Sequence, residues 1–528
     1  MTVELLRSSR PSGRPGRRQG LRLPLPANSI TVPVLLAAVL AAAYVLAPPA
    51  AGDLAAQTAR AQLFSRSGYV PWWTGWYGGT PTTSYSLTTP FLLGWFGPVW
   101  SGALALVATP VAAVPLLARA RRPAWGGCAL VLTAAADVVV GRTTFAAGVV
   151  LVLCSFSLAC RRHASAAFVL AVLATLTSPI AGVLAMVPAV AGVASDSGRR
   201  RAWCAVVVGT ASGLALLWGL AAGHAAGYEP FGRASLLPVL TAAAVLACLP
   251  VGRTLRLAAA LAAAAMLIVF FAPTAIGTNV TRLALLAALP AAVANARLSR
   301  RHLAVAAAVL AVTPVGNLFG ELATANSAGG SEQFVAGLRG QLLSLPGIAG
   351  VRVEIVDVAS HWPQTRLLPA VEPARGWERQ TDAALNPEFY QTRALNPSSY
   401  RAFLDRNAVA YVAVPIGAPL DFAAIAEAAL VNAGLPYLQQ VWSDRHWKLY
   451  AVHHPAPLIA GPPATDVRLT DTGVNFTSAA PGDYTIRLGW SPYLVVTGGT
   501  VTRAAAGAIA VHVGQAGSHQ VHAEWRLP

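Results

Sequence analysis

Long hydrophobic stretches separated by short polar connections fill the first part of the 528-residue chain. Eleven of these stretches run for about 17–25 residues, the length that an α-helix needs to cross a bilayer. Their centres lie near residues 38, 105, 132, 152, 171, 187, 211, 243, 264, 289 and 310. The pattern predicts an α-helical polytopic membrane domain of about eleven transmembrane helices over residues 30–319, preceded by a basic cytoplasmic tail at residues 1–29. Ser178-Pro179 separates the fifth and sixth stretches, which we interpret as two helices rather than one kinked helix.

Arginine divides the connections between these stretches into two sets that alternate along the chain. One set holds nineteen arginines and the other holds five: Arg60, Arg66, Arg142, Arg233 and Arg282. Short loops rich in Lys and Arg stay on the cytoplasmic side of a membrane. The alternation therefore predicts a multi-pass plasma-membrane protein with its N-terminus in the cytoplasm. After an odd number of spans, residues 320–528 are expected to be extracytoplasmic.

Composition agrees with a membrane protein and excludes a soluble enzyme. Hydrophobic residues make up 55% of the chain and charged residues 11%, whereas soluble domains carry about 25% charged residues. Residues 1–319 hold 24 arginines and five acids, whereas residues 320–528 hold 14 basic residues and 16 acids. The net charge of +17 thus belongs to the membrane half and gives no indication of nucleic acid. All five cysteines lie in apolar stretches without metal-ligand spacing, so we assign them to packing.

From about residue 320 the apolar runs shorten and acids become frequent. Helices are predicted at 331–345 and 398–407, strands at 351–357 and 409–414, and a hairpin at 441–452. Asp421 is expected to cap a further helix that ends before Gly434. This order predicts an α/β domain over residues 320–460. Beyond Pro462-Pro463, short strands between Gly, Pro and Asp turns predict a small β-sandwich over residues 461–528.

Asp53 is the one carboxylate of the first predicted external loop, residues 47–90. A lone acid at the outer end of a helix bundle suits an enzyme that acts on lipid-linked substrates, because it can deprotonate a hydroxyl. The alternative is that Asp53 caps an amphipathic helix on the membrane surface. Two further acids are secondary candidates. Asp137 lies near the outer end of the third stretch, where an ion pair with Arg142 could also explain it, and Glu229 lies on an external loop.

The connection 277–282, which contains Asn279 and ends at Arg282, is a candidate phosphate site. An arginine at a helix start, beside free backbone N–H groups, is suited to a phosphate. Arg142 could assist it, and the alternative for Arg282 is nonspecific contact with lipid headgroups. Aromatic residues supply candidate glycan contacts, although those of the first loop could instead form an interfacial belt. Those of the external domain could instead pack against the membrane domain, which we favour. These candidates are Trp72, Trp73, Trp76, Tyr77, His361 and Trp377.

Several short motifs together resemble the polytopic GT-C-class glycosyltransferases. They are Gly52-Asp53-Leu54, Pro71-Trp72-Trp73, Tyr77-Gly78-Gly79-Thr80-Pro81, 141–148, 177–182 and 277–282. The run 375–380 resembles envelope proteins of high-GC bacteria, some labelled as membrane domains related to 6-pyruvoyl-tetrahydropterin synthase. The resemblance implies transfer of a sugar from a polyprenyl-phosphate donor on the outer face, with Asp53 as the family's loop carboxylate. That family often has a second acid beside the first, whereas Leu54 follows Asp53 here, so the resemblance does not support a divalent metal.

The leading hypothesis is an inverting membrane glycosyltransferase of cell-envelope assembly. Asp53 would be the general base, and Arg282 with Arg142 and Asn279 would bind the donor phosphate. The partners would be a polyprenyl-phosphate donor, an envelope glycan or glycolipid acceptor and membrane lipids. No cofactor is assigned, and the metal is unknown. The alternatives are a non-catalytic lipid- or glycan-binding or flippase-type assembly protein and, less favoured, a secondary transporter.

Overall fold

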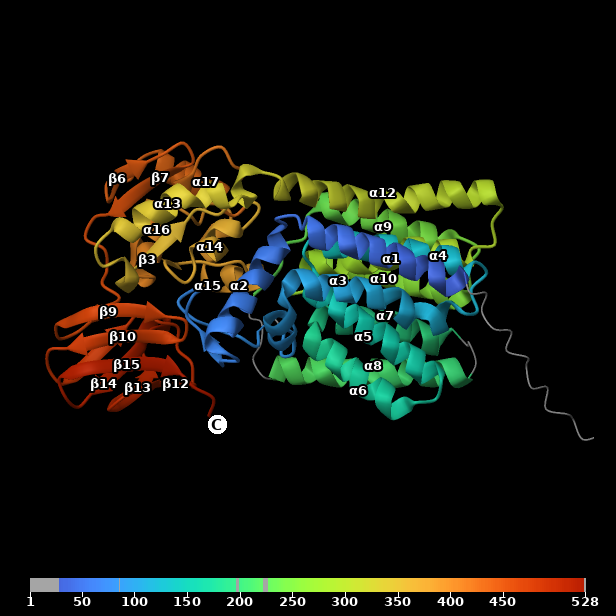
Figure 1. Cartoon of the computed structure of the whole chain (residues 1–528), viewed down its shortest axis with the longest axis horizontal. Helices are drawn as coiled ribbons and strands as arrows, with labels where there is room; N and C mark the ends of the chain where they lie inside the picture. The colour runs from blue at the N-terminus through green and yellow to red at the C-terminus, as the bar shows by residue number, and fades with distance from the viewer. Residues whose placement is uncertain (1–27, 85, 196–198, 222–226, 527–528) are drawn as a thin grey trace, which may run out of the picture.

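The computed structural model describes residues 28–84, 86–195, 199–221 and 227–526, so nearly all of the expected basic tail lies outside the described residues. The chain forms a long helical bundle joined end to end with a β-rich C-terminal part, and helix α2 lies between the two (Figure 1). Helix α12 runs along the bundle and leads into the C-terminal part (Figure 1). The two parts therefore meet at one end of the bundle.

Helices occur at all eleven positions that the hydrophobic pattern predicts. They are α1 (Asn28–Leu46), α3 (Thr89–Leu117), α4 (Pro123–Val139), α5 (Thr143–Cys160), α6 (Ala164–Thr177), α7 (Pro179–Ala194), α8 (Arg199–Ala221), α9 (Arg233–Cys248), α10 (Arg253–Phe271), α11 (Arg282–Asn295) and α12 (Arg300–Ala325). Within the described residues, six helical segments are long and apolar enough to cross a membrane, and five more are shorter apolar helices. Ser178 has an extended backbone between α6 and α7, which are two helices as expected.

Three of the arginine-rich connections meet at one end of the bundle, where the start of α1 lies beside the end of α3 and the start of α4. Arg122 donates to the backbone oxygens of Ala296 and Leu298, at 2.8 and 3.1 Å, which joins the α3–α4 and α11–α12 connections. The N–H of Arg297 donates to Pro250 O in the α9–α10 connection. These basic connections, which the sequence assigns to one side of the membrane, thus lie close together in the structure.

The first loop forms α2 (Gly52–Ser67) and a small hairpin of β1 (Trp72–Trp73) with β2 (Thr80–Pro81). Helix α2 is not a surface helix, because half of its sixteen residues are buried. It packs against α3 of the bundle and α14 of the C-terminal part. Nor does Asp53 cap it: the N-cap residue is Ala51, and Asp53 lies in the first turn.

The α/β domain is built on a five-stranded sheet with strand order β4-β3-β5-β7-β6. β3 is parallel to β4 and β5, and β7 is antiparallel to β5 and β6. Its strands are β3 (Arg352–Ile355), β4 (Glu372–Pro373), β5 (Val409–Pro415), β6 (Leu438–Ser443) and β7 (Trp447–Val452). Its helices are α13 (Glu332–Ser344), α14 (Trp362–Leu367), α15 (Arg379–Leu385), α16 (Pro397–Arg406) and α17 (Ile425–Asn432).

Two expectations for this domain need correction. The boundary expected between residues 319 and 320 falls inside α12, which continues to Ala325. Asp421 does not cap a helix in the expected way, because α17 begins at Ile425 with Ala424 as its N-cap. Asp421 instead accepts two hydrogen bonds from Arg379. Its Oδ1 also accepts a hydrogen bond of 3.0 Å from the Ala423 N–H, so the carboxylate serves both the turn that leads into α17 and the ion pair with Arg379.

The last residues form the expected β-sandwich of two four-stranded antiparallel sheets, ordered β12-β15-β10-β9 and β13-β14-β11-β8. Its strands are β8 (Ile459–Ala460), β9 (Ala464–Thr470), β10 (Gly473–Ser478), β11 (Gly482–Ile486), β12 (Leu494–Val496), β13 (Gly499–Arg503), β14 (Ile509–Val513) and β15 (Gly517–Ala523). Trp72 of the first loop packs into the core between these sheets. The hairpin of the first loop thereby attaches the sandwich to the rest of the protein.

Candidate functional site

Asp53, Arg142 and Arg282, which are distant in sequence, converge where the bundle meets the C-terminal part. Asp53 lies in the first turn of α2, Arg142 directly precedes α5, and Arg282 is the first residue of α11. Each side chain therefore lies at the start of a different helix. Because a helix N-terminus carries free N–H groups and a partial positive charge, this arrangement concentrates positive potential around the carboxylate.

The carboxylate of Asp53 lies between the two guanidinium groups without a tight bond to either. Its Oδ2 atom is 3.4 Å from Arg142 Nε and 3.6 Å from Arg282 Nη2. Tight charge-assisted hydrogen bonds to a carboxylate measure about 2.7–2.9 Å. Arg142 Nε is also a buried donor without a hydrogen-bond partner. Asp53 remains 31% exposed, whereas the side chains of the two arginines are 13% and 10% exposed.

Contacts with the bundle hold the two arginines in place. Arg142 Nη1 lies 3.3 Å from Asp137 Oδ1 and 3.4 Å from Asn317 Oδ1. Asp137 is thus the ion-pair partner of Arg142, the alternative explanation that the sequence offers for it. Arg282 lies over the ring of Phe145, with its guanidinium carbon 5.1 Å from the ring centroid. These contacts keep donor nitrogens of both arginines close to Asp53.

A short 3₁₀ turn, Gly277–Thr281, leads directly into Arg282. Asn279 lies in this turn, where its backbone oxygen accepts a hydrogen bond from the Arg282 N–H. Glu229 anchors the turn, because its Oε1 accepts a hydrogen bond of 3.1 Å from Thr278 Oγ1. Burial raises the pKa of Glu229, an effect that Arg379 opposes. Glu229 thus supports the turn that presents Arg282.

Helix α12 contributes two polar residues that sequence reasoning missed. Asn317 contacts Arg142, and Glu321 lies one helical turn further along. Glu321 is close enough to interact electrostatically with Arg142, Asp53, His361 and Arg282. Residues at i and i+4 share one face of a helix. Two polar residues at this spacing, near the end of an otherwise apolar helix, could have identified Asn317 and Glu321 from the sequence.

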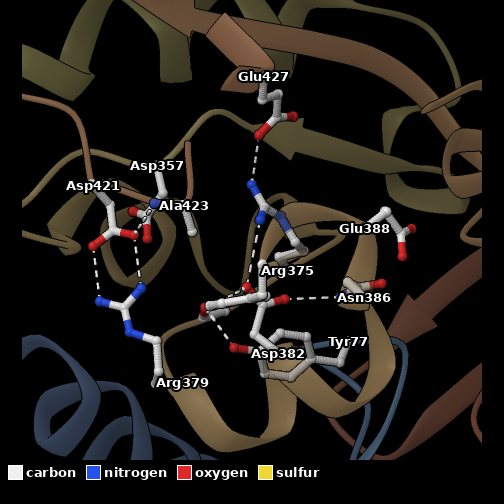
Figure 2. A network of polar contacts seen from close by, with 12 residues as sticks. Tyr77, Asp357, Arg375, Arg379, Asp382, Asn386, Glu388, Asp421, Ala423 and Glu427 are labelled. Carbon is white, nitrogen blue, oxygen red and sulfur yellow. Dashed lines mark hydrogen bonds and ion pairs between the residues drawn. The ribbon is translucent and has the colours of Figure 1, made fainter. Parts of the chain in front are cut away.

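His361, Trp377 and Arg379 of the C-terminal part lie together, and the ring of His361 lies beside Gly52, the residue before Asp53. The ring of His361 stacks on Trp377, with centroids 3.4 Å apart, and its Nδ1 lies 2.6 Å from Asp357 Oδ2. Arg379 donates two hydrogen bonds of 2.7 and 2.8 Å to Asp421 (Figure 2). Although burial acts to raise it, these bonds lower the pKa of Asp421 to about 2. Because both guanidinium nitrogens and both carboxylate oxygens are engaged, we assign this pair a structural role.

A buried network centred on Arg375 lies beside the Arg379–Asp421 pair (Figure 2). Arg375 contacts Glu354 at 2.8 Å, Glu427 at 2.6 Å and Asp382 at 3.4 Å. Glu354 and Glu427 are fully buried, and burial raises the pKa of Glu354 well above its ordinary value although Arg375 opposes this. One arginine facing three buried carboxyl groups makes this a structural centre of the α/β domain.

The aromatic residues of the first loop are buried. Trp72, Trp73, Trp76 and Tyr77 are between 1% and 9% exposed. Trp73, Trp76 and Tyr77 pack in one cluster with α2, and the Tyr77 hydroxyl donates to Gly376 O at 2.7 Å. These side chains join the first loop to the C-terminal part. Because their ring faces are covered, they form neither an interfacial belt nor an open surface for glycan contact.

Among the described residues, no group of three or more His, Cys, Asp or Glu side chains is placed to hold a metal ion. Asp53 has no second acid beside it in sequence, and both of its ion-pair partners are arginines. The donor set therefore suits an anion rather than a divalent cation, which oxygen ligands bind.

No protein-family model matches this chain, and no curated protein matches it either. Among solved structures, an oligosaccharyltransferase from Archaeoglobus fulgidus, tethered with an acceptor peptide, matches 73% of this chain and 69% of its own length. The identity is 11% and the TM-score 0.42. The arabinofuranosyltransferase AftD from Mycobacteria matches at 15% identity and a TM-score of 0.45, over 82% of this chain and 42% of AftD.

ArnT from Cupriavidus metallidurans, bound to undecaprenyl phosphate, matches at 14% identity and a TM-score of 0.41. This match covers 81% of the chain and 99% of ArnT. The matched structures are GT-C glycosyltransferases, the class that the sequence resembles.

Proposed function

We propose that the chain is a membrane glycosyltransferase that moves a sugar from a polyprenyl-phosphate donor to an envelope glycan or glycolipid acceptor. The observation that carries the proposal is the position of Asp53 between Arg142 and Arg282, at 3.4 and 3.6 Å. A partly exposed carboxylate beside two buried arginines unites a proton acceptor with an anion site. Transfer from a sugar phosphate needs these two groups.

The arginines would bind the phosphate of the donor. Arginine presents a planar fork of donors that matches phosphate, and Arg142 Nε lacks a hydrogen-bond partner. A phosphate that enters between the two guanidinium groups competes with Asp53 for them. Donor binding would thus release the carboxylate from its ion pairs when a base is required.

The reaction would proceed by direct displacement with inversion. The acceptor oxygen attacks the anomeric carbon of the sugar, and the bond between that carbon and the phosphate oxygen breaks. Asp53 accepts the hydroxyl proton, and the electron pair of the broken bond leaves with the polyprenyl phosphate. Arg142 and Arg282 stabilise the charge that develops on the leaving phosphate, since fixed cations are most effective in a poorly hydrated site.

The reaction centre would lie on the outer face of the plasma membrane. Three of the arginine-rich connections, which stay on the cytoplasmic side of membrane proteins, meet at the end where α1 begins. Asp53 lies at the other end, just after α1 ends at Leu46. The C-terminal part, which adjoins Asp53, would therefore be extracytoplasmic, and all eleven helices would span the bilayer.

A non-catalytic protein that binds lipid phosphate or glycan, or a flippase component, is the alternative. The same two arginines could bind a polyprenyl phosphate without any transfer, and such a protein would not need a proton acceptor at position 53. The transporter alternative has less support, because Asp137 is engaged with Arg142 at 3.3 Å and so is not a free ion carrier.

The proposal can be tested with the purified full chain in proteoliposomes. A panel of undecaprenyl-phosphate sugars would be supplied with envelope glycan acceptor, and release of undecaprenyl phosphate measured. The proposal predicts release with at least one donor, loss of release in Asp53→Asn, and retained undecaprenyl phosphate binding in that variant. Binding without release from any donor in the panel, in the wild-type protein, would instead support the lipid-binding alternative.

A further inference from the structure

The two neighbours of Asp53 in the sequence each lie close against a different part of the protein. Gly52 and Leu54 are both buried, and the residues that contact them come from segments distant in sequence. On one side Gly141 of the bundle touches Leu54. On the other side His361 of the C-terminal part touches Gly52. Asp53 lies between these contacts.

The bundle side of this arrangement leaves no room for a side chain. Gly141 has a φ of +89°, which favours glycine, and a Cβ atom there would lie 2.4 Å from the backbone nitrogen of Leu54. Gly141 directly precedes Arg142, the closer partner of Asp53. The backbone of α2 thus rests on the segment that also supplies this arginine.

The C-terminal side is nearly as close. A Cβ atom on Gly52 would lie 3.1 Å from His361 Cδ2 and 3.6 Å from the backbone oxygens of Ala359 and Ser360. One turn of helix later, Thr365 Oγ1 donates a hydrogen bond of 3.1 Å to Ala55 O. The segment 359–365 therefore lies along the first turn of α2, where Asp53 stands.

Three contacts fix the ring of His361 itself. Its Nδ1 lies 2.6 Å from Asp357 Oδ2, and Gln364 holds the other oxygen of Asp357 at 2.8 Å. One face of the ring stacks on Trp377 with an interplanar angle of 9°, and Nε2 lies 3.7 Å from Asp421. With 4% exposure, His361 presents an immobile ring edge to Gly52 rather than a surface to a glycan.

We propose that His361 is a positioning residue that holds Asp53 between Arg142 and Arg282. This inference rests on the proposed role of Asp53 and assigns the C-terminal part a task in the transfer reaction. The ring of His361 lies against Gly52 and the backbone of Gly141 against Leu54, so together they clamp the first turn of α2. Docking of the C-terminal part therefore determines where the Asp53 carboxylate lies, and His361 transmits that docking to it.

The test compares the full chain with its His361→Gly variant in detergent. His361 has a φ of +58°, so glycine removes the ring without opposing the backbone conformation. Hydrogen–deuterium exchange of a peptide that covers residues 51–56 reports the clamp without reference to activity. Gly340→Ala serves as the control, because an added Cβ there meets nothing within 4 Å.

The inference predicts that residues 51–56 exchange roughly tenfold faster in His361→Gly. Turnover with a donor that the wild type accepts should fall roughly 10- to 100-fold, because small misplacements of a catalytic group have effects of this size. Binding of undecaprenyl phosphate should persist, because Arg142 and Arg282 belong to the bundle. Gly340→Ala should leave all three quantities unchanged.

A second comparison tests the contact itself. Gly52→Ala alone should impair turnover, and His361→Gly should lessen the effect of Gly52→Ala by making room for the added methyl group. Unchanged exchange at residues 51–56 in His361→Gly would overturn the inference, whatever the activity. If exchange is faster in His361→Gly but the wild type transfers no sugar, the contact between His361 and α2 is supported and the proposed function is contradicted.

Discussion

The carboxylate of Asp53 lies 3.4 Å from Nε of Arg142. This separation is longer than the 2.7 and 2.8 Å hydrogen bonds by which Arg379 holds Asp421. The difference separates two kinds of ion pair in one protein. The tight pair consumes donors and acceptors on both sides, whereas the loose pair leaves Arg142 Nε without a hydrogen-bond partner. The loose pair is therefore the one suited to accept a ligand.

Arg282→Gln should weaken binding of undecaprenyl phosphate. A hydrogen bond to a charged group contributes about 1.5–3 kcal/mol, which corresponds to a rise in Kd of roughly 10- to 150-fold. Microscale thermophoresis of the detergent-solubilised protein would measure it. Arg253→Gln, at an exposed position in the first turn of α10, is the matched control. Equal Kd values for the two variants would show that Arg282 does not bind the phosphate.

Arg375→Met should strongly destabilise the α/β domain. The substitution leaves Glu354, Glu427 and Asp382 buried without their shared cation. Removal of one partner from a buried ion pair costs about 3–5 kcal/mol. Amide exchange of β5 in the full chain would report the change.

Arg526→Met removes the exposed pair of Arg526 with Glu524 and provides the comparison. Exposed pairs contribute less than about 1 kcal/mol. If Arg375→Met and Arg526→Met left β5 equally protected, the network around Arg375 would not be a structural centre.

The stability of the C-terminal part should fall as the pH rises from about 4.5 to about 8, because Glu372 ionises more readily in the unfolded chain than in the folded protein. Burial raises the pKa of Glu372 from 4.5 to about 8, although Arg352 opposes this. In this window the folded protein binds the proton and the unfolded chain has released it, so rising pH favours unfolding. Each pH unit contributes at most about 1.4 kcal/mol.

The check for Glu372 is the thermal midpoint of wild type and Glu372→Gln across this pH range. Glutamine cannot ionise, so the wild type should lose stability relative to the variant as the pH rises. Parallel curves for the two proteins would show that Glu372 does not titrate in this window.

The membrane half was predictable because a bilayer imposes local rules. A span must be about 20 apolar residues long, so each helix can be recognised without its neighbours. Charged residues are rare there, which is why Asp53, Arg142 and Arg282 could be singled out from sequence. Their convergence could not be derived, because it depends on how α2, α5 and α11 pack.

The C-terminal part was predictable in its local elements and not in its contacts. An alternating pattern indicates β3, a short apolar run indicates β5, and two runs around a turn indicate the β6–β7 hairpin. No pattern indicates that His361 meets Gly52 or that Trp72 enters the sandwich core. Asp421 has the signature of a helix cap and accepts a hydrogen bond from the Ala423 N–H just before α17, but no local pattern indicates its tight pair with Arg379. Glu321 was overlooked because the domain boundary was expected before it, whereas α12 continues to Ala325.

The role of Asp53 as the base is best tested by the envelope glycan composition of a deletion strain complemented with wild type or Asp53→Asn. Asparagine keeps the size of the side chain but cannot accept the proton, and Asp53 does not cap α2. We expect one glycosyl linkage to disappear on deletion and to return with wild type only, at equal protein levels. If Asp53→Asn restores that linkage fully, Asp53 is not the base, and the proposed displacement reaction is wrong.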